Sequence, residues 1–155
     1  MHSNELIGIA APQIGYNYKI FVTHPRETKW RPKDQADDLR IYINPKITYS
    51  SKRENIIYEG CGCVLDGKLM GPVKRPASIS VVAYEPNKSK FQLDCDGILG
   101  RVIQHEYDHM FGIEFTEKIC DYKKLMYVDF YIKFIKESKK HKKASEITKV
   151  NFKEL

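Results

Sequence analysis

Short stretches of alternating or β-branched residues predict a sheet-rich chain. Five such stretches are typical of strands: residues 18–23, 41–43, 47–50, 56–58 and 79–85. Residues 90–94 return as the hairpin partner of the last stretch, and Asn44-Pro45 is expected to stop the second. Residues 6–15 are small and apolar, with glycine and proline between them, which favours close backbone packing over a helix.

The periodicity changes at residues 98–110 and predicts a helix there. The apolar positions recur three and four residues apart, at Leu99, Val102, Ile103 and Tyr107. Asp96 is a typical N-cap and Gly112 a typical C-terminal stop. Residues 122–135 carry a helical apolar stripe after Asp121, although their aromatic and β-branched content also suits a strand. We therefore expect an α+β fold, with antiparallel or mixed sheets around a central helix and a further C-terminal helix or strand.

Length and charge predict one folded domain with a basic end. The 155 residues suit a single core, and polar residues 24–40 are expected to form a surface loop. Seven of the lysines and only three acidic residues lie in residues 136–155, so much of the net charge of +6 is in this segment. We expect a catalytic domain over residues 1–135 and a basic tail over 136–155. The tail is predicted to be solvated, and contact with an anionic partner remains open.

Composition also limits the compartment and the partners. No apolar run approaches the roughly 18 residues of a membrane helix, and residues 1–5 lack a signal pattern. Four cysteines are too few for a disulfide scaffold. The near-neutral body does not indicate a DNA-binding face. We expect a protein of a cytoplasm or an organelle matrix that is not secreted and that binds neither DNA nor membrane.

The strongest chemical signal is His105-Glu106-Tyr107-Asp108-His109 on the predicted helix. Two histidines four residues apart project from one helix face and can hold one metal ion. Glu106 lies near the same edge, where it can act on a metal-bound water rather than ligate. Two histidines make an incomplete site, so a third ligand is expected.

The third ligand is not fixed by spacing alone. One known motif has a third histidine six residues after the second, but Phe115 stands there in this chain. Another motif uses a glutamate from a later helix. Glu117 lies too close to the histidines in sequence for this, and Glu137 belongs to the basic tail. The cysteines are better candidates: Cys61 ends a predicted strand among glycines, and Cys63 is its rival two residues later. The other two cysteines are expected to be small buried residues: Cys95 and Cys120.

A thiolate with two imidazoles suits zinc, iron, nickel or cobalt. Such an ion lowers the pKa of bound water towards about 7, which predicts hydrolysis of a carbonyl compound. Gln13 is a candidate donor to the resulting oxyanion because it is an amide in an otherwise apolar segment. The competing interpretation of Gln13 is a side chain that satisfies loop backbone.

Three stretches, in this order, resemble the signature motifs of the peptide deformylases. They are Gly-Ile-Ala-Ala-Pro-Gln-Ile-Gly at 8–15, Glu-Gly-Cys at 59–61 and Gln-His-Glu-Tyr-Asp-His at 104–109. The resemblance implies one divalent metal ion, usually Fe²⁺ in the family, on Cys61, His105 and His109. It implies Glu106 as the general acid and base.

The same resemblance implies a substrate. The formyl oxygen of an N-formyl-methionyl peptide would face Gln13 and the backbone N–H of Gly62. Gly8 would offer backbone to the peptide. The methionine pocket would be lined by Ile57, Ile98 and Val102. An anionic contact of the basic tail would then be with the ribosome.

This sequence departs from the family pattern at several positions. Leu6 stands where the family has glycine, and Gly62 and Cys63 stand where it usually has leucine and serine. The following loop is slightly longer, and Lys68 or Met70 lies where an arginine is usual. The N-terminal region before the first motif is expected to be shortened. These departures leave two alternatives: an impaired, deformylase-like peptide-binding module, and a metallohydrolase of another amide.

Overall fold

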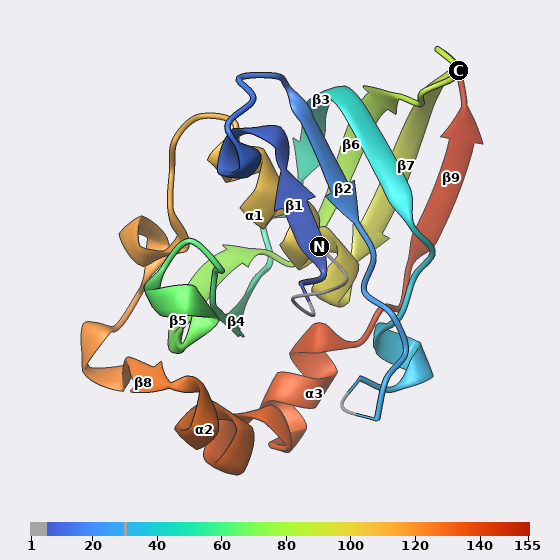
Figure 1. Ribbon diagram of the computed structural model, residues 1–155. Helices are drawn as coiled ribbons and strands as arrows, with labels where there is room; N and C mark the ends of the chain where they lie inside the picture. Colours follow the sequence, from blue (N-terminus) through green and yellow to red (C-terminus); the bar gives the residue numbers. More distant parts are fainter. Residues whose placement is uncertain (1–5, 30) are drawn as a thin grey trace.

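Two antiparallel sheets enclose one long helix, as the α+β prediction requires (Figure 1). The computed structural model describes residues 6–29 and 31–155. The larger sheet has the order β1-β2-β3-β6-β7-β9, with bounds β1 Gly8–Ala10, β2 Ile20–Thr23, β3 Arg40–Ser50, β6 Ser78–Tyr84, β7 Lys90–Asp96 and β9 Val150–Glu154. The smaller sheet has the order β4-β5-β8, with bounds β4 Glu54–Glu59, β5 Leu69–Pro76 and β8 Met126–Tyr127.

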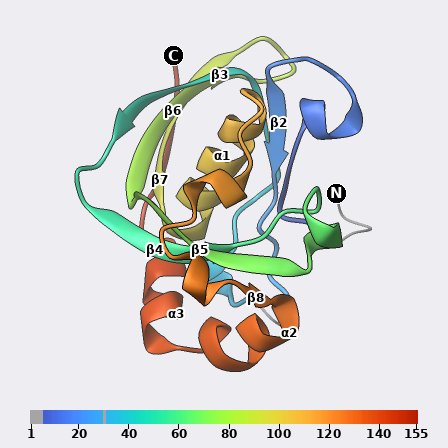
Figure 2. The same cartoon turned by 90° about the vertical axis from the view of Figure 1, so that its left-hand side faces the viewer.

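The helices lie between and below these sheets (Figure 2). They are α1 Gly97–His109, α2 Val128–Tyr131, which continues as a π-helical turn over Ile132–Lys136, and α3 Lys139–Ser145. Shorter 3₁₀ turns occupy Ala11–Ile14, Lys33–Gln35, Leu65–Gly67, Phe115–Lys118 and Tyr122–Lys124. No helix of the described residues has the length and apolarity to cross a bilayer.

The main core fixes α1 against the larger sheet. Leu99, Val102 and Ile103 are buried on the inner face of the helix, as their spacing predicts. They share one cluster with sheet residues, including Phe21 and Leu93. Because this stripe is held by close packing, the polar residues on the opposite side of α1 have a fixed orientation toward the smaller sheet.

Two predicted boundaries were wrong. Asn44-Pro45 does not end a strand, because β3 continues through it with a break in register between Ile43 and Lys46. Asn44 adopts a left-handed φ of 48°, which asparagine tolerates, and the strand bends instead of stopping. The glycine-rich stretch after Cys63, which we expect from its sequence to be a loop as far as Pro72, is also shorter, since β5 begins at Leu69 and pairs with β4 and β8.

Residues 122–135, expected to form a helix or a strand, form a short piece of each. Asp121 caps a 3₁₀ turn by accepting from the Lys123 N–H at 3.1 Å. Met126 then pairs with Met70 in the smaller sheet, and helix begins only at Val128. The mixed composition of the segment therefore corresponds to strand followed by helix.

The basic segment 136–155 is not the solvated end that its charge predicts. It contains α3 and β9, and β9 is the edge strand paired with β7. Phe152 stacks on Phe91 with ring centroids 5.0 Å apart. Charge counting missed this strand because its pairing with β7 uses backbone groups, which a count of charged side chains does not register.

The Asp96 side chain binds the backbone of segment 136–155 instead of capping α1. Its carboxylate accepts from the backbone N–H groups of Thr148 and Lys149, at 2.8 and 2.9 Å. It makes no side-chain hydrogen bond to the helix that it precedes. Gly97 has a φ of 57°, and a Cβ there would overlap the carbonyl oxygen of Glu146, so the segment packs directly on the start of α1.

Candidate active site

Cys61, His105 and His109 converge at the end of α1. Both histidines are buried, and Cys61 lies in the turn that follows β4. One potential donor atom from each of the three lies within 4.8 Å of the others, and the Cys61 Sγ is 3.3 Å from the His109 Nε2. The rival Cys63 is exposed and groups with Cys61 and Glu114 instead of with the histidines.

The other candidate ligands have different places. Glu117 accepts from the Glu114 backbone N–H at 2.9 Å, and Glu137 pairs with Lys142 at 2.6 Å. Cys95 is buried as predicted. Cys120 is exposed, contrary to prediction, and its thiol donates to the carbonyl oxygen of Pro72 at 3.3 Å.

Glu59 orients the first histidine, a role that sequence reasoning did not assign. Its Oε2 lies 2.9 Å from the His105 Nδ1, which leaves the Nε2 of that ring for the donor cluster. Arg75 donates to both carboxylate oxygens of Glu59, at 2.8 and 3.0 Å, and Arg101 donates at 2.9 Å. Arg75 and Arg101 lie near the motifs in sequence and could have indicated a buried carboxylate. That both pair with Glu59 is visible only in the structure.

This network sets the charges of the site. Burial raises the pKa of Glu59, but hydrogen bonds from His105 and Arg75 outweigh it and hold that pKa far below its usual range. Burial lowers the pKa of His105, and the Glu59 carboxylate more than reverses this effect, so the pKa of His105 is raised. Glu59 is therefore an anion that keeps a proton on the Nδ1 of His105.

The other two donors suit a cation. Burial, and then the neighbouring His105, lower the pKa of His109 to about 4, so this imidazole is neutral and has a lone pair to donate. Burial raises the pKa of the Cys61 thiol, so a thiolate at this position needs a cation beside it. One sulfur and two imidazole nitrogens form a donor set that fits a divalent transition metal.

Glu106 is buried beside this cluster. Burial raises the pKa of Glu106 to about 7, although the nearby His105 opposes the rise. Its Oε2 has no hydrogen-bond partner among the described residues. A Cβ on Gly8 would overlap Oε1 of Glu106 and lie 2.7 Å from the Cγ2 of Val102, so β1 approaches this carboxyl group as only glycine allows. Such a carboxyl group is poised to exchange a proton near neutral pH.

The two ends of the Gln13 side chain make different contacts. Its side-chain oxygen accepts from the Ala10 N–H at 2.7 Å, which satisfies loop backbone. Its amide nitrogen is then directed at the sulfur atoms of Cys61 and Cys63, at 3.6 and 3.4 Å. The loop bond therefore aims the donor end of Gln13 at the cluster.

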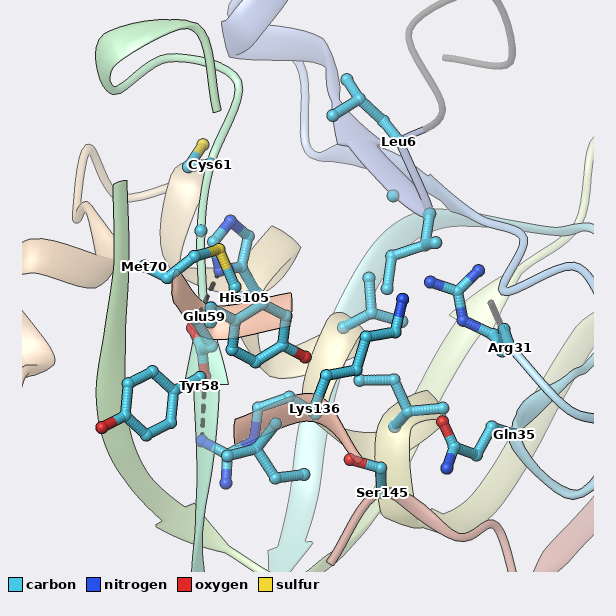
Figure 3. Close-up of a pocket in the computed structure, with 18 of the residues that line it drawn as sticks. Leu6, Arg31, Gln35, Tyr58, Glu59, Cys61, Met70, His105, Lys136 and Ser145 are labelled. Atoms are coloured by element: carbon cyan, nitrogen blue, oxygen red, sulfur yellow. Dashed lines mark hydrogen bonds and ion pairs between the residues drawn. The ribbon is translucent and has the colours of Figure 1, made fainter. Parts of the chain in front are cut away.

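One cavity of about 340 Å³ connects these groups (Figure 3). Gly8, Gln13, Cys61, Gly62, His105 and Glu106 line it together with Ile57, Ile98, Val102 and Met70. Such a volume suits a small ligand or a short side chain. Leu6 borders the same cavity, and a Cβ on Gly62 would be in ordinary contact with Leu6 at 3.6 Å. Lys68, in contrast, accepts from the Val128 N–H through its backbone.

Comparison with known proteins yields one consistent family. The profile of the polypeptide deformylase family matches residues 1–125. A peptide deformylase of Treponema pallidum is 38% identical over 113 residues, which cover 73% of this chain and 62% of that protein. Peptide deformylase 1 of Clostridium perfringens is 38% identical over 117 residues, covering 76% of this chain and 72% of the relative. The chain thus spans 62% of the length of the Treponema relative.

Solved structures give the same result. A probable peptide deformylase from Synechococcus phage S-SSM7 has a TM-score of 0.66 and 34% identity, covering 77% of this chain and 76% of that one. A class I type b peptide deformylase from Acinetobacter baumannii, bound to Met-Ala-Ser, has a TM-score of 0.70 and 29% identity. That match covers 77% of this chain and 74% of the other.

Proposed function

This chain belongs to the peptide deformylase family, and from that premise we propose that it removes the N-formyl group from the N-terminal methionine of nascent peptides. The observation that carries the proposal is the convergence of Cys61, His105 and His109 at one point, beside a cavity that is lined by Cys61 and His105 and also by the Glu106 carboxyl group and the Gln13 amide. Formylated peptides are made by bacterial-type translation, so the protein would act in such a cytoplasm or in an organelle matrix.

Cys61, His105 and His109 would hold the metal ion, and Glu59 would keep the His105 ring oriented. When bound, the ion would supply an activated water and polarise the formyl group. Fe²⁺ is the ion expected, and the donor set also accommodates Zn²⁺, Ni²⁺ or Co²⁺.

Glu106 would move the proton that the reaction requires. The oxygen of water bonds to the formyl carbon, the carbon–nitrogen bond breaks, and formate and a free amine result. In this scheme Glu106 takes a proton from the water and returns it to the departing nitrogen. Its raised pKa suits both transfers near neutral pH.

Gln13 and Gly62 would stabilise the charge that develops on the formyl oxygen. The Gln13 amide is already held by the Ala10 N–H, so it needs little reorganisation. The Gly62 backbone N–H would be the second donor. A glycine restrains its own N–H less than other residues do, so this donor would be the weaker contributor.

The rest of the cavity would hold the peptide. Ile57, Ile98 and Val102 provide apolar walls for the first side chain. β1 is an edge strand with β2 as its one partner in the sheet order, so the backbone at Gly8 can pair with an extended peptide. The Acinetobacter neighbour, which binds Met-Ala-Ser, supports this substrate class.

The direct test is formate release from formyl-Met-Ala-Ser by protein loaded with Fe²⁺ or Co²⁺ under anaerobic conditions. We expect release that Glu106→Gln abolishes nearly completely while the metal content stays unchanged. Binding of the peptide without formate release would contradict hydrolysis and support a binding module. Release of acetate from acetyl peptides at an equal rate would contradict the formyl specificity.

We also propose that the lysines of segment 136–155 contact the ribosome. Lys139, Lys140 and Lys143 are exposed on α3. Phosphate contacts by lysines give salt-dependent binding. Co-sedimentation with ribosomes should weaken when all three are changed to glutamate, whereas formate release from a free peptide should stay constant. Unchanged co-sedimentation of the triple variant would contradict this partner.

A further inference from the structure

The cavity extends past its apolar walls to a polar end that the family match includes only in part. Figure 3 places Arg31, Gln35 and Ser145 on the opposite side of the cavity from Cys61; these three residues are the distal end. Arg31 and Gln35 come from the segment between β2 and β3, and Ser145 ends α3. Ser145 lies beyond residues 1–125, so this end is built partly by sequence outside the matched region.

The Ser145 hydroxyl is the unusual group at the distal end. The residue is 2% exposed, and its Oγ has no hydrogen-bond partner among the described residues. A helical serine commonly donates to the carbonyl four residues earlier, but this one makes no such bond. An unpaired buried hydroxyl is costly, so its position beside a cavity points to a partner supplied by a bound molecule.

The backbone around Ser145 is held firmly. The Asn55 side chain donates to the Ala144 carbonyl at 3.3 Å, and the Ile147 N–H donates to the Asp34 carbonyl at 2.7 Å. Asp96 then accepts from Thr148. These bonds come from three different parts of the chain. The backbone at Ser145 is therefore held in place beside the cavity that the residue lines.

The neighbouring charge favours an acceptor in the ligand. Arg31 donates to the Arg26 carbonyl at 3.3 Å, and no carboxylate pairs with it in the part of the chain that the structure describes. The nearby Glu137 is already paired with Lys142 at 2.6 Å. Because Arg31 brings a positive charge to this end of the cavity, a ligand group that accepts hydrogen bonds is better matched than a purely apolar one.

We propose that the distal end is a specificity site in which Ser145 donates a hydrogen bond to an acceptor at the tip of the first side chain of the substrate. The inference rests on the proposed function, because it assumes that this side chain runs along Ile57, Ile98 and Val102. Norleucine, with a methylene in place of sulfur, offers no acceptor, and methionine offers a weak one. Methionine sulfoxide offers a strong one and is the best-matched side chain.

The test compares three peptides that differ at this tip: Met-Ala-Ser, its methionine sulfoxide form and norleucine-Ala-Ser. Calorimetry on the metal-loaded protein gives their affinities, and formate release gives kcat/KM for their formylated forms. Ser145→Ala should reduce affinity for the sulfoxide peptide by roughly 2- to 12-fold, the range of one hydrogen bond, and leave the norleucine peptide unchanged.

Ser138→Ala is the matched control. Ser138 caps the same helix by accepting from the His141 N–H at 3.3 Å, and it is not among the cavity-lining residues. It should lower stability without changing the ratio of sulfoxide to norleucine affinity. An unchanged ratio in Ser145→Ala, or no binding of any of the three peptides, would overturn the proposal. Absence of formate from every substrate would instead overturn the proposed function, while the affinities would still decide the role of Ser145.

Discussion

The two ends of the cavity are built in different ways. At the Cys61 end, two short motifs supply the donors, and Glu59 with two arginines satisfies most of the buried charge. At the distal end, Gln35 and Ser145 are far apart in sequence, and a hydroxyl is left without a partner. Local motifs therefore supply the potential metal donors of this protein, whereas long-range packing builds the far end of its cavity.

Cys61→Ala should have the largest effect on the Cys61 end. Two histidines alone hold a catalytic metal poorly, so we expect loss of the metal and of formate release. Elemental analysis after gel filtration measures this directly. Cys63→Ala is the matched control and should retain metal, because Cys63 groups with Glu114 and not with the histidines. The opposite pattern in the two variants would show that Cys63 is the ligand.

Glu106→Gln separates proton transfer from metal binding. It should lower kcat by about 10²–10⁴, the usual contribution of a general acid or base. Metal content should not change, since Glu106 is outside the donor group of Cys61, His105 and His109. Steady-state kinetics with a metal assay on the same sample is the measurement. Normal turnover by the loaded variant would contradict this role.

Glu59→Gln tests the charge network behind the metal ligands. Metal affinity should fall by about 10- to 100-fold, as when other carboxylate partners of ligating histidines are lost. The free energy of unfolding should fall by about 3–5 kcal/mol, because Arg101 remains buried without its carboxylate and Arg75 keeps only Asp108. Competition with a chelator and urea unfolding measure the two effects.

Glu54→Gln is the control for that experiment. Glu54 lies on the same strand and pairs with Lys74 at 3.7 Å in an exposed position. Exposed pairs contribute at most about 1 kcal/mol, so little change is expected. Equal effects of the two variants would mean that burial of Glu59 has no special consequence.

Asp96→Asn tests how the C-terminal segment, which carries Ser145, is held against the start of α1. The variant loses acceptor capacity for Thr148 and Lys149, and unfolding should become easier by about 1–3 kcal/mol. Hydrogen exchange should accelerate over 146–154 and not over α1. Asp94→Asn, on the same strand, loses only the longer contacts to Asn151 and Lys149, so its effect on stability should be smaller. If hydrogen exchange accelerated equally across the whole chain, residues 146–154 and α1 would not be stabilised independently.

Gly62→Leu should give the smallest effect. It restrains the backbone donor and restores the side chain usual in the family, so kcat should rise with little change in KM. The rise should be below about tenfold, because complete loss of such a donor costs about 10²–10³. Leu6 is close to the new side chain, so Leu6→Gly is measured alone and in combination. No gain in either background would show that the Gly62 donor is already well placed.

The sequence by itself determined the parts of the molecule that depend on near neighbours in the chain. The helix Gly97–His109, the β6–β7 hairpin and the pair His105 and His109 all follow from spacings of two to four residues. Cys61 became the preferred third ligand because of the glycines around it and because of the family resemblance. Spacing of this kind fixes which side chains share one face, whatever the rest of the chain does.

Only the tertiary structure decided the remaining features. Asp96 looks like a helix cap in sequence but binds residues more than fifty positions later, and Glu59 has partners on β5 and α1. The segment 136–155 carries the charge of a solvated end, yet β9 completes the sheet and Ser145 closes the cavity. Pairings across such separations leave no periodic signal in the sequence, because they depend on which distant surfaces meet when the chain folds.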